Sequence, residues 1–83
     1  MNSQDIHNKL TTIIVERVNR ALVPSQVTMD SRLREDLSID SLNAAELMYE
    51  IQEEFGADVS EAEEAGLRTI RDVVLAIEQK RAA

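Results

Sequence analysis

The most informative stretch of this sequence is Leu33-Arg34-Glu35-Asp36-Leu37-Ser38-Ile39-Asp40-Ser41-Leu42. Asp40 is a good N-cap residue, and apolar residues recur after it at the steps of an amphipathic helix. The pattern predicts a helix from about Ser41 to Phe55, ended by Gly56. Ser41 then lies in the first turn, where its hydroxyl is exposed and free backbone N–H groups favour a phosphate. The same residues can also simply cap a helix.

At about 100° per residue, the predicted helix 41–55 has two faces. Its core face carries Ala44, Leu47, Met48, Ile51 and Phe55. The opposite face, which we call the outer face, carries Leu42, Ala45, Glu46, Tyr49 and Glu53. The outer face is a candidate surface for partner contacts, although scattered exposed apolar residues are also normal.

The segment before residue 24 reads as a helix with one apolar stripe. The stripe is Ile6, Leu10, Ile13, Ile14, Val18 and Leu22. Asn2 or Ser3 can cap its start, and Pro24 marks a region where it must have ended. Residues 24–40 then form a long connection, for which we expect an ordered loop with a helical turn near Leu33. Its apolar residues are expected to pin it to the core: Val27, Met29, Leu33, Leu37 and Ile39.

Two capping-box spacings predict the remaining helices. Ser60 with Glu63 opens a short segment that Gly66 ends, and Thr69 with Asp72 opens a last helix. The last helix has the apolar stripe Ile70, Val73, Val74 and Ile77, and the basic residues Lys80 and Arg81 at its negative end. The sequence therefore predicts an all-α fold, a small four-helix bundle of three main helices and one short one, with a long first loop and one domain over residues 1–83.

The composition restricts the possible partners. Sixteen acidic and nine basic residues give a net charge of −7, which argues against binding to nucleic acid or to an anionic membrane surface. The polar N-terminus is unlike a secretory signal, and no apolar run is long enough to span a bilayer. We therefore expect a cytoplasmic monomer that does not insert into membranes. The absence of cysteine excludes disulfides, so any thiol chemistry needs an imported thiol.

Signatures of enzymes are missing. The one histidine, His7, lies just inside the first predicted helix, where a surface position is usual. Without it no Ser/His/Asp set can be assembled, and the chain has neither a glycine-rich phosphate loop nor metal-ligand spacing. We therefore predict no catalytic residue and no metal site.

Residues 33–55 resemble the acyl carrier protein family, whose pattern reads Leu-x-x-Asp-Leu-Gly-x-Asp-Ser-Leu, followed by an acidic helix that ends in Glu-Glu-Phe. The matching positions are Leu33, Asp36, Leu37, Asp40, Ser41, Leu42, Glu46, Leu47, Glu53, Glu54 and Phe55. Downstream, Thr69-Ile70 and Val73-Val74 match the start of the family's last helix. The resemblance covers nearly the whole chain.

This resemblance implies a carrier rather than an enzyme. A phosphopantetheinyl transferase would attach 4′-phosphopantetheine from coenzyme A to Ser41, with Asp40 and Leu42 as flanking recognition residues. The thiol of the arm would then hold acyl groups as thioesters for enzymes of fatty-acid, lipid or related biosynthesis. The basic docking surfaces of these enzymes would meet the outer face.

Two other functions are compatible with the sequence. One is a carrier of amino acids, of the peptidyl or D-alanyl type, although peptidyl carriers usually place Gly-Gly-x-Ser where this chain has Ile39-Asp40-Ser41. The other is an unmodified helical module that binds proteins through its acidic face.

Five positions depart from the family pattern. Ser38 replaces the loop glycine, which predicts a backbone conformation that does not demand positive φ. Asn43 and Gln52 replace acids, while Ala45 and Tyr49 replace aliphatic or methionine positions. Because the last four lie on or near the outer face, they predict a specialised carrier with its own partners rather than the general carrier of fatty acid synthesis.

Overall fold

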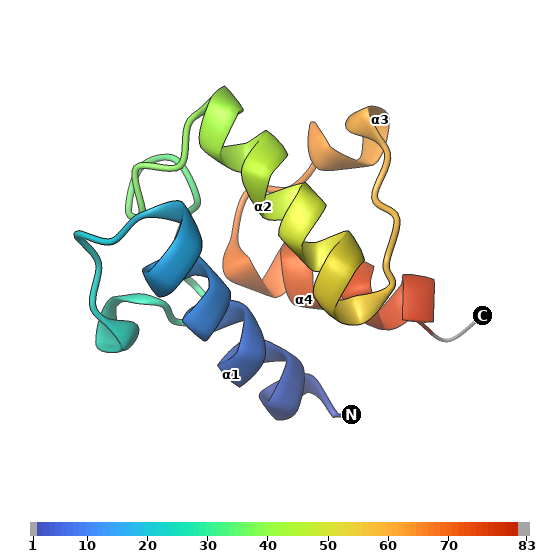
Figure 1. Ribbon diagram of the computed structural model, residues 1–83, viewed down its shortest axis with the longest axis horizontal. Coiled ribbons are helices and arrows are strands. Elements are labelled where there is room, and N and C mark those ends of the chain that lie inside the picture. Colours follow the sequence, from blue (N-terminus) through green and yellow to red (C-terminus); the bar gives the residue numbers. More distant parts are fainter. Residues whose placement is uncertain (1, 82–83) are drawn as a thin grey trace.

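The computed structural model describes the backbone of residues 2–81 and the side chains of residues 2–80, so the side chain of Arg81 lies outside the described part. The described residues form three long α-helices, one short α-helix and a long loop after the first helix, arranged as in Figure 1. The helices are α1 (Ser3–Ile13), α2 (Ser41–Phe55), α3 (Glu61–Glu64) and α4 (Ile70–Arg81). The predicted all-α bundle is confirmed. The assignment of residues 1–83 to one domain stays a prediction.

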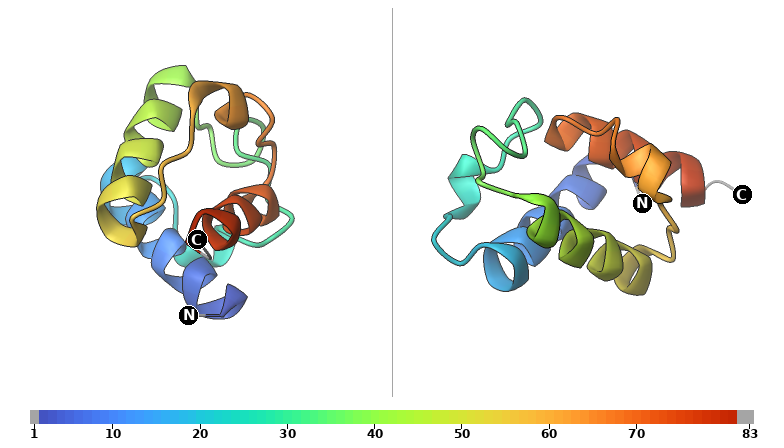
Figure 2. Two further views of the ribbon diagram at one scale, coloured as in Figure 1. Left: turned by 90° about the vertical axis from the view of Figure 1, so that its right-hand side faces the viewer. Right: turned by 90° about the horizontal axis from the view of Figure 1, so that it is seen from above.

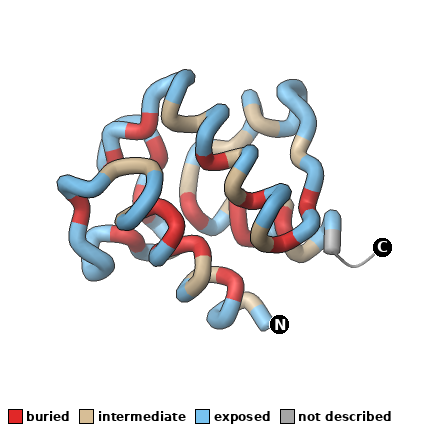
Figure 3. Tube along the Cα trace, viewed as in Figure 1, coloured by how far each residue is buried: buried red, intermediate tan, exposed pale blue. Residues whose placement is uncertain are grey.

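The apolar stripes of the three long helices meet in one core. Figures 1 and 2 show α1 lying against both α2 and α4, and Figure 3 shows buried segments on all three of these helices. The helices bury Ile6, Leu10, Ile13, Leu47, Ile51, Phe55, Ile70, Val73, Val74 and Ile77. Burial of apolar surface, at roughly 25 cal/mol per Å², is the main force that holds the helices together. Because α2 buries its core face, it leaves its outer face to solvent.

Local signals set the helix starts and the end of α2 as predicted. Asp40 caps α2, because its carboxylate accepts the N–H of Asn43 at 2.9 Å, and Gly56 ends the helix with φ +67°. The other helices begin with reciprocal capping bonds: Asn2 with Asp5, Ser60 with Glu63, and Thr69 with Asp72. Helix α3 ends slightly earlier than predicted, with Ala65 rather than Gly66 as its C-cap.

The first helix differs from its prediction at its C-terminal end. Regular α-helix stops at Ile13, and residues Ile14–Val18 form one wide π-helical turn (η1). Asn19 then adopts an extended conformation, so the chain leaves the helix axis before Leu22. Leu22 is buried, but from the turn that follows the helix. The prediction that Leu22 continues the helical stripe is therefore wrong, because the wide turn ends the helix early.

The long loop is ordered, and it is attached to the start of α4. After the short 3-10 turn η2 (Pro24–Gln26), three backbone hydrogen bonds join the two segments. They run from Leu33 N–H to Arg68 O (2.9 Å), from Ile70 N–H to Ser31 O (3.0 Å) and from Arg71 N–H to Met29 O (2.9 Å). The expected turn near Leu33 is present, since the N–H groups of Asp36 and Leu37 both donate to Arg32 O. His7 adds a link from α1, because its ring Nε2 donates to Val27 O at 2.8 Å.

Ser38 has φ +54°, so the prediction that it avoids positive φ is wrong. Its two neighbours are fixed: Asn19 Nδ2 donates to Leu37 O at 3.0 Å, and Ile39 N–H donates to Leu33 O at 2.9 Å. Leu37 and Ile39 are both buried, and Ser38 adopts the left-handed conformation between them. A left-handed conformation costs a residue with a Cβ roughly 1–2 kcal/mol.

Replacement of Ser38 by glycine should therefore stabilise the protein. Glycine relieves the left-handed strain, and this gain exceeds the free-energy cost of ordering its more flexible backbone on folding. The net stabilisation should be about 0.5–1 kcal/mol. Urea denaturation of wild type, Ser38→Gly and Ser38→Ala measures the difference. The alanine variant is the matched control, because it keeps the Cβ, and it should not gain stability. Equal stability of the glycine and alanine variants would show that residue 38 is not strained.

Stability should also fall in acid through Asp72. Its carboxylate accepts the backbone N–H of Arg68 at 2.9 Å and that of Thr69 at 3.2 Å, and the bond from Arg68 chiefly holds the pKa of Asp72 below its ordinary value. A lowered folded-state pKa gives stability that is present above the unfolded-state pKa, about 3.9, and is lost as the pH falls below it.

The variant Asp72→Asn should be less stable than wild type near neutral pH, and the gap should narrow below about pH 4. Urea denaturation at several pH values measures this. Asp58→Asn is the control, because Asp58 is exposed and makes no hydrogen bond among the described residues. A gap between wild type and Asp72→Asn that is the same at acid and neutral pH would contradict the prediction.

Candidate functional site

Ser41 is the first residue of α2, and its side chain is exposed to solvent. Within residues 2–80 no hydrogen bond engages its hydroxyl. Asp40 already satisfies the N–H of Asn43, and the N–H of Ala44 donates to Asp40 O at 2.8 Å. The N–H groups of Ser41 and Leu42 therefore remain free at the positive end of the helix dipole. Ser41 thus has the open space and the free hydrogen-bond donors that an attached phosphate needs.

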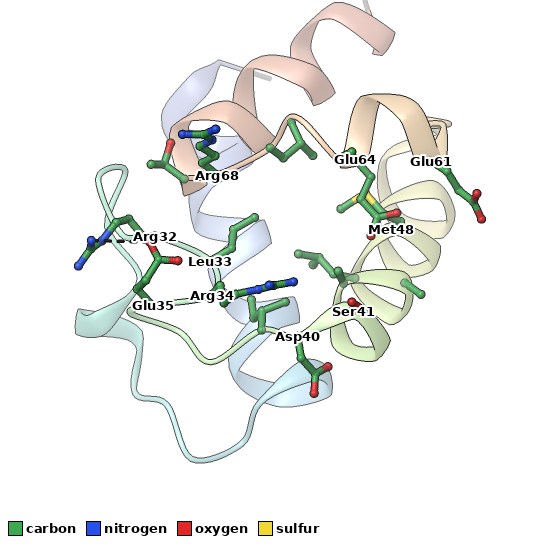
Figure 4. Close-up of a pocket in the computed structure, with 17 residues that line it drawn as sticks. Arg32, Leu33, Arg34, Glu35, Asp40, Ser41, Met48, Glu61, Glu64 and Arg68 are labelled. Atoms are coloured by element: carbon green, nitrogen blue, oxygen red, sulfur yellow. Dashed lines mark ion pairs between the residues drawn. The ribbon is translucent and has the colours of Figure 1, made fainter.

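An open pocket of about 970 Å³ lies beside Ser41, between α2, the loop and the segment around α3 (Figure 4). Its apolar lining includes Leu33, Ile39, Ala44, Leu47, Met48 and Leu67. Its charged lining is Arg32, Arg34, Glu35, Asp40, Glu61, Glu64 and Arg68. A group attached to Ser41 can therefore extend either into solvent or into a pocket with both apolar and charged walls. The sequence alone does not reveal this pocket, because its walls come from segments far apart in the chain.

All five residues of the predicted outer face lie exposed on α2. Leu42 is 70% exposed and Tyr49 is 61% exposed, an unusual degree for such large side chains. The carboxylate of Glu53, which accepts a hydrogen bond from the phenol and adds its charge, raises the pKa of Tyr49. The outer face thus combines an exposed leucine and an exposed aromatic ring with the carboxylates of Glu46 and Glu53.

The other two acids of α2 are used within the molecule. Arg17 Nη1 lies 2.6 Å from Glu50 Oε2 and 3.4 Å from Glu54 Oε1, and Lys9 Nζ lies 3.7 Å from Glu54 Oε2. These pairs join α2 to α1 and η1. Glu50 and Glu54 are therefore largely neutralised, whereas Glu46 forms none of the ion pairs found within residues 2–80. This division between paired and unpaired acids cannot be read from the sequence, since residues 33 positions apart leave no periodic signal.

Asn43 lies away from the outer face. It is half-buried, and its side-chain Nδ2 approaches Val18 O at 3.5 Å. An acid at this position would bring its charge close to a backbone carbonyl of η1. The family pattern commonly has an acid at residue 43. Its replacement by asparagine therefore affects the contact with η1 more than it affects the surface available to a partner.

The described part of the chain has neither a metal-binding cluster nor a membrane-spanning helix. Within it, no group of three or more histidine, aspartate or glutamate side chains is arranged to hold a metal ion. No described helix is long and apolar enough to cross a membrane. A small helical domain with an exposed, unbonded serine at a helix start, beside an open pocket, has the layout of a carrier domain rather than that of an enzyme.

Comparison with known proteins agrees with this class. The family model described as "phosphopantetheine attachment site" matches residues 8–77, and the chain belongs to this family. The family's cofactor is covalently attached 4′-phosphopantetheine. Membership also implies interaction with a phosphopantetheinyl transferase and with biosynthetic enzymes.

The relatives that match this chain over nearly its full length are named acyl carrier protein. An acyl carrier protein of Thermosynechococcus vestitus (strain NIES-2133 / IAM M-273 / BP-1) is 34% identical over 83 residues, which is the whole of both chains. An acyl carrier protein of Phytoplasma australiense is 38% identical over 74 residues, 89% of this chain and 95% of the relative. One of Rickettsia bellii (strain RML369-C) is 34% identical over 77 residues, 93% and 87% respectively.

Proposed function

We propose that Ser41 carries the phosphopantetheine arm and that this protein is an acyl carrier. It holds acyl groups as thioesters and delivers them to enzymes of fatty-acid, lipid or related biosynthesis. The observation that carries the proposal is the position of Ser41, exposed and unbonded at the first residue of α2, directly after Asp40 and before Leu42. The names of the full-length relatives support acyl groups as the cargo.

The chain's own residues contribute attachment and presentation. In loading, the Ser41 oxygen forms a bond to phosphorus, the pyrophosphate bond of coenzyme A breaks, adenosine 3′,5′-bisphosphate leaves, and the hydroxyl proton passes to a base on the transferase. The free N–H groups of Ser41 and Leu42 favour the new phosphate. Once attached, the arm supplies the thiol that this cysteine-free chain lacks.

The outer face of α2 is the proposed contact surface for the transferase and the biosynthetic enzymes. Exposed Leu42 and Tyr49 offer apolar contact, and Glu46 and Glu53 attract a basic partner surface. Charge complementarity speeds encounter more than it tightens binding, which suits a protein that must leave each partner again. Flanking recognition by Asp40 and Leu42, the monomeric state and the cytoplasmic location stay predictions.

We also propose that the carrier is specialised. The departure at Asn43 does not support this proposal, because its side chain is half-buried against η1. Tyr49 and Ala45 still give the outer face its own shape, and Gln52 is exposed close by. A reshaped contact surface can exclude a wrong partner.

Replacement of Ser41 by alanine should abolish loading and leave the fold intact. The hydroxyl makes no bond among the described residues, and Asp40 still caps α2. After incubation with coenzyme A, magnesium and a broad-specificity transferase, intact mass should show one arm on wild type and none on Ser41→Ala. A mass increase in the variant would show that attachment occurs elsewhere. Circular dichroism is the control for folding.

Charge reversal on the outer face should slow loading. The double variant Glu46→Lys/Glu53→Lys replaces attraction by repulsion toward a basic partner, and we expect a loading rate about tenfold lower at low salt. Added salt should slow wild type, since exposed charges are screened over about 8–10 Å. Loading rates are followed by intact mass over time.

The matched control is Glu16→Lys/Asp58→Lys, which makes the same charge change at two exposed acids outside α2. It should load much faster than the outer-face variant. Equal slowing in both double variants would mean that total charge, rather than the outer face, governs the encounter.

A further inference from the structure

Arg34 differs from the other arginines that line the pocket. Arg32 is paired, with Asp36 at 3.3 Å and Glu35 at 3.6 Å, and Arg68 points away from the pocket in Figure 4. Arg34 extends from the loop into the pocket, toward the start of α2 (Figure 4). Its guanidinium takes part in none of the hydrogen bonds or ion pairs found within residues 2–80. Arg34 therefore brings a cation without a counter-ion into the pocket that Ser41 also lines.

Several carboxylates near Ser41 disfavour an anion. Asp40 directly precedes Ser41, and Glu35 and Glu64 line the same pocket. A phosphate on Ser41 is repelled by these carboxylates, and a nearby cation would offset this repulsion in addition to the free N–H groups at the start of α2. A guanidinium is well suited to this task, because its planar fork of donors matches the oxygens of a phosphate.

We propose that Arg34 binds the phosphate that joins the arm to Ser41 and so directs the arm into the pocket. This inference rests on the proposed function, in which Ser41 carries phosphopantetheine. The phosphate is the anion that every loaded molecule contains, and it lies at the end of the pocket toward which Arg34 points. The apolar walls at Leu33 and Met48 then receive the part of the arm beyond the phosphate. A carboxylate on the cargo is the other source of an anion for the same guanidinium.

The test compares apo and loaded protein by NMR, after intact mass has shown how much of each sample is loaded. On loading of wild type, hydrogen exchange at the Arg34 Nε–H should slow roughly two- to fivefold, the size expected for an exposed charge pair. The ³¹P resonance of the loaded protein should shift in Arg34→Gln. It should stay in place in Arg68→Gln, the matched control, which makes the same charge change at the same pocket with a side chain directed away.

The other outcomes overturn the inference, and they show whether the proposed function fails with it. If wild type takes up no arm, the proposed function fails and the inference fails with it. If wild type loads but Arg34 exchange is the same in apo and loaded protein, only the inference fails. Acetyl-loaded and malonyl-loaded proteins separate the two anions: slowing that appears only with malonyl assigns Arg34 to a cargo carboxylate and rules out the phosphate.

Discussion

The three backbone hydrogen bonds between loop residues 29–33 and residues 68–71 constrain the rest of this structure. Each contributes only about 1 kcal/mol, whereas ordering a loop costs roughly 1–2 kcal/mol per residue, so burial of the loop's apolar side chains must supply the balance. Val27, Leu37 and Ile39 do this. Once the loop is fixed against α4, its last bond, from Ile39 to Leu33, delivers Asp40 and Ser41 to the start of α2. The geometry of Ser41 therefore depends on contacts with residues 68–71, much further along the chain.

Most of the fold is predictable from the sequence, because the helix ends are specified locally. The caps at Asp40, Ser60 and Thr69 and the stop at Gly56 act over three or four residues. The two errors have a different origin. Ser38 takes a left-handed conformation because the residues on both sides of it are held by distant partners, and Leu22 leaves the helical stripe because η1 widens the helix. Neither effect leaves a signal in the neighbouring residues.

Some features of the candidate site are likewise predictable from the sequence, and others are not. The exposure of Ser41 and the composition of the outer face follow from the period of one amphipathic helix. Other features depend on how separate elements are placed: the pocket, the pairing of Glu50 with Arg17, and the lack of an ion pair for Arg34 within residues 2–80. The net charge of −7 therefore does not describe the charge of the outer face. Glu50 and Glu54 of α2 are paired with basic residues of this chain, whereas Glu46 and Glu53 are exposed.

The outer face also has an optical consequence. Tyr49 is the only tyrosine, and the chain has no tryptophan. Nearly all of the protein's near-ultraviolet fluorescence must therefore arise from a single ring on the surface where partners are proposed to bind. The Glu53 carboxylate beside that ring is positioned to affect its emission, and an arriving lysine or arginine would draw the carboxylate away. The protein thus contains an intrinsic fluorescent reporter for encounters on this face, without an attached dye.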